Sequence, residues 1–115
     1  MAECLFCKIV AGEIPAKILK RSDEILAFRD IDPKAPVHLL IIPIRHIPAV
    51  RDATGDEGER LLGRLLAFTA ELAREHDLDA EGYRIVTNTG RNAGQSVDHL
   101  HVHLLGGRKL SWPPG

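Results

Sequence analysis

The 115-residue sequence predicts an α+β fold, an antiparallel meander sheet of about five strands with one long and one short helix. Short apolar segments recur between turns rich in Gly, Pro, Asp and Ser, which is typical of strands. One stretch of about twenty residues instead carries apolar side chains at helical spacing. A content of 44% hydrophobic and 27% charged residues is that of a globular protein. The length suits one domain, residues 1–115.

The N-terminal half is expected to hold the short helix and three strands. Apolar residues from Phe6 to Val10 are spaced like one short helix, with Gly12 positioned to end it. Ser22-Asp23 reads as a two-residue hairpin turn, and Asp30 to Pro36 as a loop stiffened by its prolines. The strands are expected over 17–21, 24–29 and 37–43. The third is apolar on both faces except at His38, which favours a central place in the sheet.

The C-terminal half is expected to hold the long helix and two more strands. Thr54 and Glu57 have the spacing of a capping box, and the helix is expected to run to about His76. Gly63 within it is expected to permit close packing. Its buried stripe would contain Leu61, Leu62, Leu65, Leu66, Phe68, Leu72 and Ala73. Strands are expected over 82–87 and 96–105, with a loop at 90–94 and an irregular tail at 110–115.

Charge and apolar patterning exclude several classes of function. The formal net charge is −1, so nothing predicts a basic surface for nucleic acid or an anionic membrane. The segment Met1 to Val10 lacks the basic start and long apolar run of a signal peptide, and the apolar run Val37 to Ile44 is too short to span a bilayer. Two cysteines three residues apart do not make a secreted disulfide framework. We therefore expect a cytoplasmic protein with no nucleic-acid or membrane partner.

Three of the six histidines alternate with aliphatic residues at the end of the chain: His99, His101 and His103. On a strand, residues two apart share a face, so the imidazoles would line up roughly 6.5–7 Å apart. The intervening Leu100, Val102 and Leu104 would point into the core. A lone histidine is usually an exposed or core residue, but three in alternation indicate a site that moves protons and binds an anion or a metal.

A polar, glycine-containing loop from Asn88 to Ser96 precedes the histidines. Its glycines permit tight backbone whose free N–H groups can gather around an anion. Asn88, Gln95 and Ser96 add neutral donors. By itself this loop is also compatible with an ordinary turn, but beside a histidine-rich strand it indicates a phosphate site.

These motifs resemble the histidine-triad superfamily, in its nucleotide-binding phosphoramidase branch. The resemblance rests on His99-x-His101-x-His103 followed by two aliphatic residues, and on motifs spread over essentially the whole chain. Those motifs are Glu13–Lys17, Phe28–Ile31, Ala35–His38, Ile42-Pro43, Asn88–Gly90, Ala93–Val97, Leu105–Arg108 and Trp112–Gly115.

The resemblance implies a homodimer that binds purine nucleoside monophosphates and hydrolyses their phosphoramidates, releasing AMP and an amine without a catalytic cofactor. It implies that His101 is the nucleophile and forms a covalent nucleotidyl-histidine, which splits one displacement into two. His103 and Ser96 would donate to phosphoryl oxygens or to the leaving nitrogen, and the N–H groups of the 94–96 loop, Gly94 and Gln95 included, would stabilise phosphoryl charge. His38 would be the supporting fourth histidine, although without the resemblance a satisfied core histidine is the favoured interpretation.

The resemblance also places the nucleoside. Asp30 and Ile31 match the family's nucleoside contacts, and a carboxylate can accept both ribose hydroxyls. Trp112 would reach the active site of the partner subunit and shape the leaving-group preference, or else serve as a packing anchor. An apolar slot for the base, or plain core, would be formed by Leu5, Phe6, Ile9, Phe28 and Leu40.

Cys4 and Cys7 form a C-x-x-C pair that needs two more ligands to complete a tetrahedral zinc site. His46 and His99 are the candidates, and bacterial members of the superfamily use residues in this pattern. The resemblance therefore implies a structural Zn²⁺ held by these four side chains. The alternatives are a pair of reduced, buried cysteines and a redox dithiol.

Three other functions remain open from the sequence. One is dinucleoside polyphosphate hydrolysis, the chemistry of another branch of the superfamily. A second is a nucleotide sensor or partner-binding dimer with little catalysis. The third sets the resemblance aside and places a catalytic zinc on His99, His101 and His103, with one open coordination position.

Overall fold

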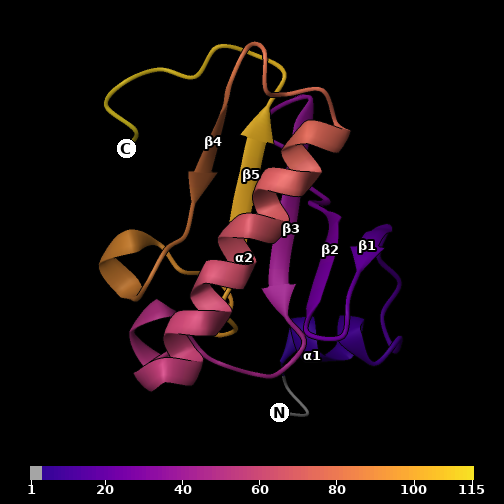
Figure 1. Cartoon of the computed structure of the whole chain (residues 1–115), viewed down its shortest axis with the longest axis vertical. Helices are drawn as coiled ribbons and strands as arrows, with labels where there is room; N and C mark the ends of the chain where they lie inside the picture. The colour runs from indigo at the N-terminus through magenta and orange to yellow at the C-terminus, as the bar shows by residue number, and fades with distance from the viewer. Residues whose placement is uncertain (1–3) are drawn as a thin grey trace.

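The computed structural model of the chain describes residues 4–115 and confirms the predicted fold class. An open antiparallel sheet carries a long and a short helix (Figure 1). The strands are β1 Ile18–Arg21, β2 Ile25–Arg29, β3 Val37–Pro43, β4 Tyr83–Val86 and β5 Val102–Gly106. The helices are α1 Leu5–Val10 and α2 Gly55–Glu75, with 3₁₀ turns η1 Val50–Asp52 and η2 Arg91–Ala93. The prediction that Met1 to Val10 is not a signal peptide also covers residues 1–3, which lie outside the described residues.

The strand order is β1-β2-β3-β5-β4, which differs from a simple meander in its last two strands. After β3 the chain passes through α2 to the edge strand β4, and β5 returns between β4 and β3. All neighbours are antiparallel, and Leu40 on β3 pairs with His103 on β5. This order brings the histidine-bearing end of the chain beside the strand that carries His38.

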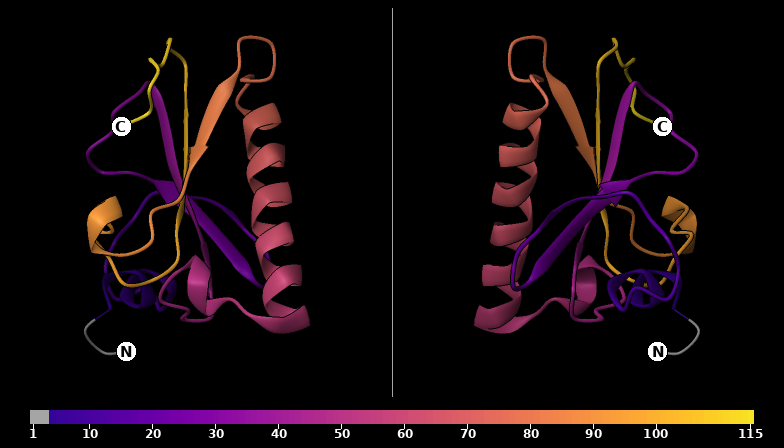
Figure 2. Two further views of the ribbon diagram at one scale, coloured as in Figure 1. Left: turned by 90° about the vertical axis from the view of Figure 1, so that its left-hand side faces the viewer. Right: turned by 90° about the vertical axis from the view of Figure 1, so that its right-hand side faces the viewer.

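Helix α2 covers one face of the sheet, whereas α1, η2 and the C-terminal tail lie on the other side (Figure 2). The inward face of α2 is buried against sheet residues such as Ile41 and Leu104. This face consists of Leu61, Leu65, Phe68 and Leu72. Each such side chain contributes about 1.5–3 kcal/mol on burial. No helix within residues 4–115 is long and apolar enough to cross a bilayer.

The predicted helix stripe was too wide and its packing glycine was wrong. Leu66 is 52% exposed, because it lies about 100° round the helix from Leu65. A Cβ on Gly63 would meet nothing, but one on Gly58 would lie 2.3 Å from the carbonyl carbon of Ala53. The glycine that permits close approach is therefore Gly58.

The ends of the long helix were placed correctly, but the predicted capping box does not form. Thr54 is the N-cap, yet its side chain makes no capping hydrogen bond. The Glu57 carboxylate accepts instead from the guanidinium of Arg60. An ion pair between the first and second turns of the helix has replaced the reciprocal cap. The first hairpin turn also lies one residue later than predicted, since the Ser22 N–H donates to the Ile25 carbonyl around Asp23-Glu24.

The opposite face of the sheet holds a second apolar cluster beneath α1. Phe6 packs there with Leu26, Phe28, Leu40 and Ile42. Three residues of the predicted base slot, Phe6, Phe28 and Leu40, are therefore buried core. Ile9 is half-buried against them, and Leu5 is 43% exposed.

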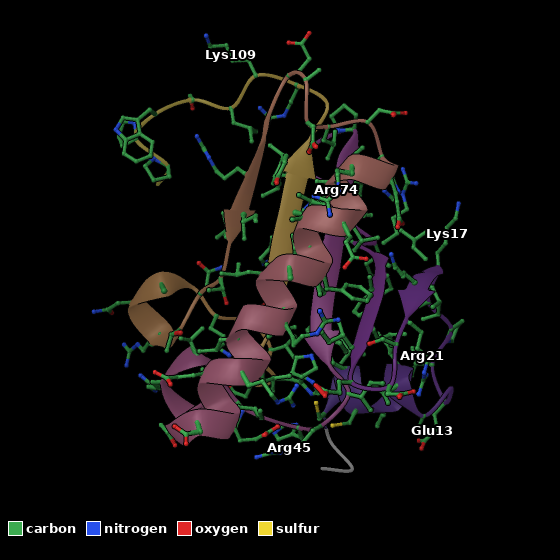
Figure 3. All side chains as sticks on the ribbon, in the orientation of Figure 1. Glu13, Lys17, Arg21, Arg45, Arg74 and Lys109 are labelled. Atoms are coloured by element: carbon green, nitrogen blue, oxygen red, sulfur yellow. The ribbon has the colours of Figure 1, made fainter. Side chains whose placement is uncertain are left out.

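Charged side chains such as Glu13, Lys17 and Lys109 lie at the rim of the molecule (Figure 3).

The last strand is shorter than predicted: β5 begins at Val102, not at Ser96. In the register that pairs Ile41 with Val102, the partner of Leu100 would be Pro43, which has no N–H to continue the ladder. The Leu100 N–H donates instead to the Ile47 carbonyl at 2.6 Å. Leu100 is still buried in the core, as predicted, but the three histidines do not form one row on a strand.

Candidate functional site

His101 is a buried imidazole held in one orientation by the backbone. Its Nδ1 lies 2.7 Å from the carbonyl oxygen of His99. A carbonyl only accepts, so Nδ1 carries a proton, and in the neutral ring the lone pair is then on Nε2. The carbonyl of His101 in turn accepts from the Thr87 hydroxyl at 2.8 Å, and the Phe6 ring packs edge-on against the imidazole, with centroids 5.1 Å apart. A nucleophilic nitrogen needs this arrangement.

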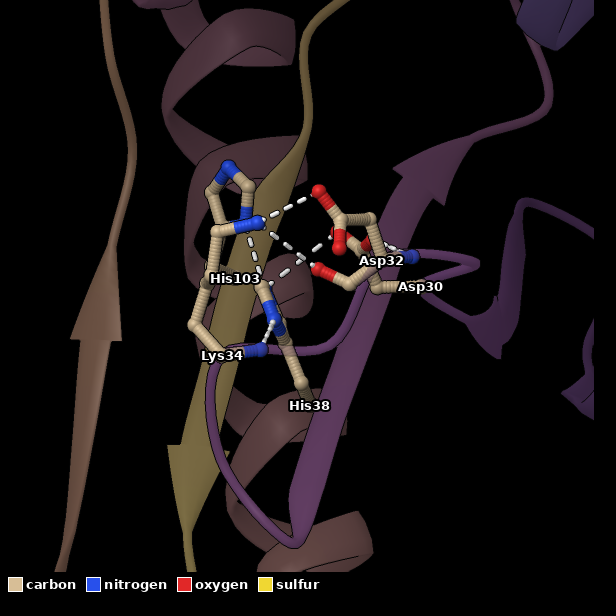
Figure 4. Close-up of polar contacts among 5 residues, drawn as sticks. All are labelled: Asp30, Asp32, Lys34, His38 and His103. Carbon is tan, nitrogen blue, oxygen red and sulfur yellow. Dashed lines mark hydrogen bonds and ion pairs between the residues drawn. The ribbon is translucent and has the colours of Figure 1, made fainter.

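His103 and His38 are joined by a hydrogen bond whose direction the backbone sets. The Lys34 N–H donates to His38 Nδ1 at 3.0 Å, so the His38 proton resides on Nε2. That Nε2 lies 2.9 Å from His103 Nδ1, which must then accept (Figure 4). The remaining His103 nitrogen, Nε2, is consequently an N–H donor. Its ring lies beside His101, with centroids 5.2 Å apart.

Burial keeps this histidine pair neutral. Desolvation lowers the pKa of His103 to about 4, with further lowering from His101 and His38. Desolvation also lowers the pKa of His38, against the opposing effect of the Asp30 carboxylate. Near neutral pH the two rings therefore hold one proton each, as the hydrogen-bond directions require. The site then presents an N–H donor on His103, next to the His101 tautomer that the His99 carbonyl selects.

Asp30 and Ile31 lie on the loop between β2 and β3, next to this pair. One Asp30 oxygen accepts from the Asp32 N–H at 2.8 Å, and the other lies 3.4 Å from His38 Nε2 (Figure 4). Ile31 is 96% exposed. The loop thus offers a carboxylate and an uncovered apolar side chain beside the histidines.

The loop that follows β4 uses most of its polar groups internally. The Gly94 N–H donates to the Arg91 carbonyl, and the Gln95 N–H donates to the Gly90 carbonyl. The Gln95 carboxamide is also engaged within the protein. Within residues 4–115, neither the N–H nor the hydroxyl of Ser96 has a hydrogen-bond partner. Asn88 lies half-buried just beyond the end of β4.

Cys4, Cys7, His46 and His99 come together at the end of the sheet under α1. Cys4 Sγ lies 3.4 Å from His99 Nδ1, and Cys7 Sγ lies 3.3 Å from His46 Nδ1 and 3.6 Å from His99 Nδ1. Sulfur and nitrogen ligands of one tetrahedral zinc are separated by about 3.6 Å, given Zn–S near 2.3 Å and Zn–N near 2.0–2.1 Å. The spacing of the four side chains therefore fits a tetrahedral metal ion.

The protonation of His99 fits a metal ligand as well. Its Nε2 lies 2.8 Å from the Pro43 carbonyl, which can only accept, so the proton is on Nε2 and Nδ1 faces the cysteines with a lone pair. Desolvation lowers the pKa of His99, which keeps the ring neutral. Both cysteines are free thiols, and burial raises the pKa of Cys7.

Asp30, His38 and His103 form a second cluster of side chains close enough to share a metal ion. The hydrogen bond from Lys34 argues against that use. A metal on His38 Nε2 would force the ring proton onto Nδ1, where it would face the Lys34 N–H donor at 3.0 Å. The cluster therefore fits a proton on His38 Nε2 better than a metal ion there.

The sequence profile of the HIT domain matches residues 11–110 of this chain. The chain belongs to the histidine triad (HIT) family. It is 51% identical over 98% of its length to an uncharacterized HIT-like protein of Synechococcus elongatus, covering 97% of that protein. It is 47% identical over 94% of its length to the purine nucleoside phosphoramidase of Escherichia coli, covering 90% of it. The crystal structure of a HIT family hydrolase from Legionella pneumophila superimposes with a TM-score of 0.94 at 50% identity, over 98% of this chain and all of that one.

Some polar groups that shape the HIT site of this chain were not predicted from the sequence. The Lys34 N–H and the Pro43 and His99 carbonyls set the histidine protons, but backbone groups carry no residue signal. Thr87 was assigned only to a strand, although its hydroxyl anchors His101. Its place immediately before the predicted phosphate loop was the one available hint.

Trp112 lies in the C-terminal tail and is 80% exposed, which does not fit a packing anchor within this chain. The tail touches the sheet through Ser111, whose carbonyl accepts from the Arg84 guanidinium at 2.9 Å. A contact of Trp112 with a partner subunit stays a prediction.

Proposed function

We propose that this HIT protein hydrolyses purine nucleoside 5′-phosphoramidates and releases AMP through a covalent intermediate on His101, and that residues 1–115 act as one domain. One observation carries the proposal: the hydrogen bond from His101 Nδ1 to the His99 carbonyl, which selects the neutral tautomer with its lone pair on Nε2. The E. coli relative named purine nucleoside phosphoramidase supports this choice of substrate.

The reaction has two displacements. His101 Nε2 attacks the α-phosphorus while the P–N bond of the substrate breaks. The departing amine takes a proton from His103 Nε2, because an amine is a poor leaving group without one. The His38 N–H on His103 Nδ1 stabilises the negative charge that His103 then carries. Water attacks the phosphorus of the nucleotidyl-histidine, returns a proton to His103, and releases AMP and the free His101 imidazole.

The remaining contacts bind the nucleotide. Asp30 accepts the ribose hydroxyls, Ile31 covers the base, and Phe6 supports the site from below through its contact with His101. Ser96 donates its N–H and hydroxyl to the phosphoryl oxygens, where growing negative charge makes donors most valuable. Asn88, Gly94 and Gln95 belong to the same phosphate loop.

We also propose a structural Zn²⁺ on Cys4, Cys7, His46 and His99. Bound there, zinc would supply a cross-link between α1 and the end of the sheet, and no part of the reaction. The chemistry needs no cofactor. The chain would act as a homodimer, with Trp112 placed at the partner's site, where it influences the choice of amine.

The test is AMP release from an adenosine 5′-phosphoramidate by wild-type protein and by His101→Ala. The expected result is turnover that falls at least about a thousandfold in the variant, since removing a nucleophile removes the covalent route. The wild type should also form a base-stable adduct of one AMP per chain, detected by intact mass after an alkaline quench.

A dinucleoside polyphosphate and a chelator complete the experiment. Preferred cleavage of the dinucleotide would favour the polyphosphate hydrolase. AMP binding without turnover of either substrate would favour a sensor. Turnover abolished by a chelator, with no adduct, would favour a catalytic zinc on the three histidines.

A further inference from the structure

Gln95 has every polar group of its side chain engaged within the protein. Its Oε1 accepts from the Gly90 N–H at 2.8 Å. Its Nε2 donates to the Pro48 carbonyl at 2.7 Å and to the Val97 carbonyl at 3.0 Å. These bonds join both ends of the 90–97 loop to each other and to the segment that follows β3.

The loop has little else to hold it. Residues 91–94 are all exposed, so apolar burial contributes little there. Gly90 and Gly94 have φ near +80°, a conformation that glycine adopts without strain but also leaves easily. Hydrogen bonds rather than packing therefore fix the position of this loop, and one carboxamide makes three of them.

Ser96 is next to Gln95 in the chain, and its position depends on the three hydrogen bonds of the Gln95 carboxamide. It stands between Gln95, which carries the carboxamide, and Val97, whose carbonyl accepts a hydrogen bond from it. The Gly94 and Gln95 N–H groups are committed inside the loop, so Ser96 carries the N–H and hydroxyl left to face a ligand among residues 94–96. A shift of the loop would move these donors relative to the phosphoryl group that the proposed function places at His101.

We propose that Gln95 is a positioning residue, which acts through Ser96 by holding its N–H and hydroxyl against the phosphoryl group of the substrate. The inference rests on the proposed function. It replaces the expectation that the Gln95 side chain touches the nucleotide directly, because a carboxamide with both N–H groups donated inward has no donor left for phosphate.

The first variants are Gln95→Glu and Gln95→Met. Glu keeps the shape but turns two donors into acceptors that face the Pro48 and Val97 carbonyls, whereas Met keeps the volume and removes all three bonds. Displacements near 1 Å in an active site cost about a hundredfold in rate. We expect kcat to fall at least about tenfold in both variants, with KM changed less than about threefold. Asn92→Ala, an exposed position on the same loop, is the matched control and should keep wild-type kinetics.

A double-mutant cycle separates positioning from general destabilisation. If Gln95 acts through Ser96, then Gln95→Met should cost little more once Ser96 is replaced by alanine. Multiplicative losses in Gln95→Met/Ser96→Ala would overturn the proposal, as would an unchanged kcat in both single variants. The melting temperature of each variant checks that it is folded. If Gln95→Glu does not fold, Gln95→Met provides the test.

The wild-type assay keeps this inference distinct from the function on which it rests. If wild-type protein does not cleave the phosphoramidate, the proposed function fails. The same double-mutant cycle is then measured as AMP affinity by calorimetry, because the phosphate of AMP would still need the Ser96 donors. Non-additive losses of AMP affinity would support the role of Gln95, and additive or absent losses would refute it.

Discussion

The carbonyl oxygen of His99 accepts a hydrogen bond from Nδ1 of His101 at 2.7 Å, while the His99 ring faces the two cysteines. One residue therefore belongs to two sites. Its side chain completes the Cys₂His₂ cluster, and its backbone fixes which nitrogen of His101 is free to react. Ordering of the cluster and orientation of the His101 imidazole are physically connected over a single residue.

Cys7→Ala should remove zinc and weaken the fold. Loss of one of four ligands leaves an incomplete tetrahedral site, and a metal that binds the native state stabilises it by mass action. We expect about one zinc per chain in wild-type protein prepared without chelators and none in the variant, together with a melting temperature lower by several degrees. Elemental analysis and thermal unfolding measure the two. Lys8→Ala on the same helix is the control, and a wild type free of zinc would remove the idea.

His38→Phe should slow the reaction without much change in nucleotide binding. The substitution keeps a ring but removes the N–H on His103 Nδ1, so the His103 proton is no longer confined to Nε2. A misplaced imidazole proton is costly in hydrolases that depend on one tautomer. We expect kcat to fall by about 10- to 100-fold with KM within about threefold, measured by AMP release. His76→Phe, at the end of α2, is the control and should retain full activity. An unchanged kcat in His38→Phe would refute the role of the His38–His103 hydrogen bond in the reaction.

The outline of the fold followed from local patterns, because each element carries its own signal. Helical spacing predicted α2 between Thr54 and His76, and alternation predicted that Leu100 and Leu104 face the core. The order of the last two strands did not follow, since either order satisfies the same patterns. The start of β5 depends on Pro43 in a partner strand, a non-local cause that no reading of residues 96–105 contains.

The candidate site could also be predicted from the sequence only in part. The cysteines and the histidine triad were named from residue type and spacing, and Asp30 and the role of His38 from the resemblance. The structure brings most of these side chains into two clusters, Cys4, Cys7, His46 and His99, and Asp30, His38 and His103. What the sequence could not supply was the direction of each hydrogen bond, because backbone groups of Lys34, Pro43 and His99 set it. Gln95 was selected as a donor for phosphate, but its residue type does not reveal that its bonds close inward.

Leu72→Ala and Leu66→Ala should separate the core face of α2 from its flank. Leu72 is 1% exposed in the main core, whereas Leu66, about one and two-thirds turns earlier on the same helix, is 52% exposed. Truncating a buried leucine costs about 2–5 kcal/mol through lost burial and the cavity that remains. We expect that loss for Leu72→Ala and less than about 1 kcal/mol for Leu66→Ala, from urea unfolding. Equal losses would mean that a further contact covers Leu66, as a subunit interface would.

Native-state stability should fall as the pH drops from about 6.5 towards about 4, in part because of His103. Burial lowers the pKa of His103 from its ordinary value of 6.5 to about 4. In that window the unfolded chain binds a proton at His103 that the native state does not, so the unfolded state is favoured as the pH falls. Replacing the group by His103→Gln should remove this contribution while leaving those of the carboxylates. The melting temperature measured at about pH 7 and about pH 5 should therefore differ less in the variant than in the wild type. An equal or larger difference in the variant would show that His103 takes up its proton in the native state as readily as in the unfolded chain.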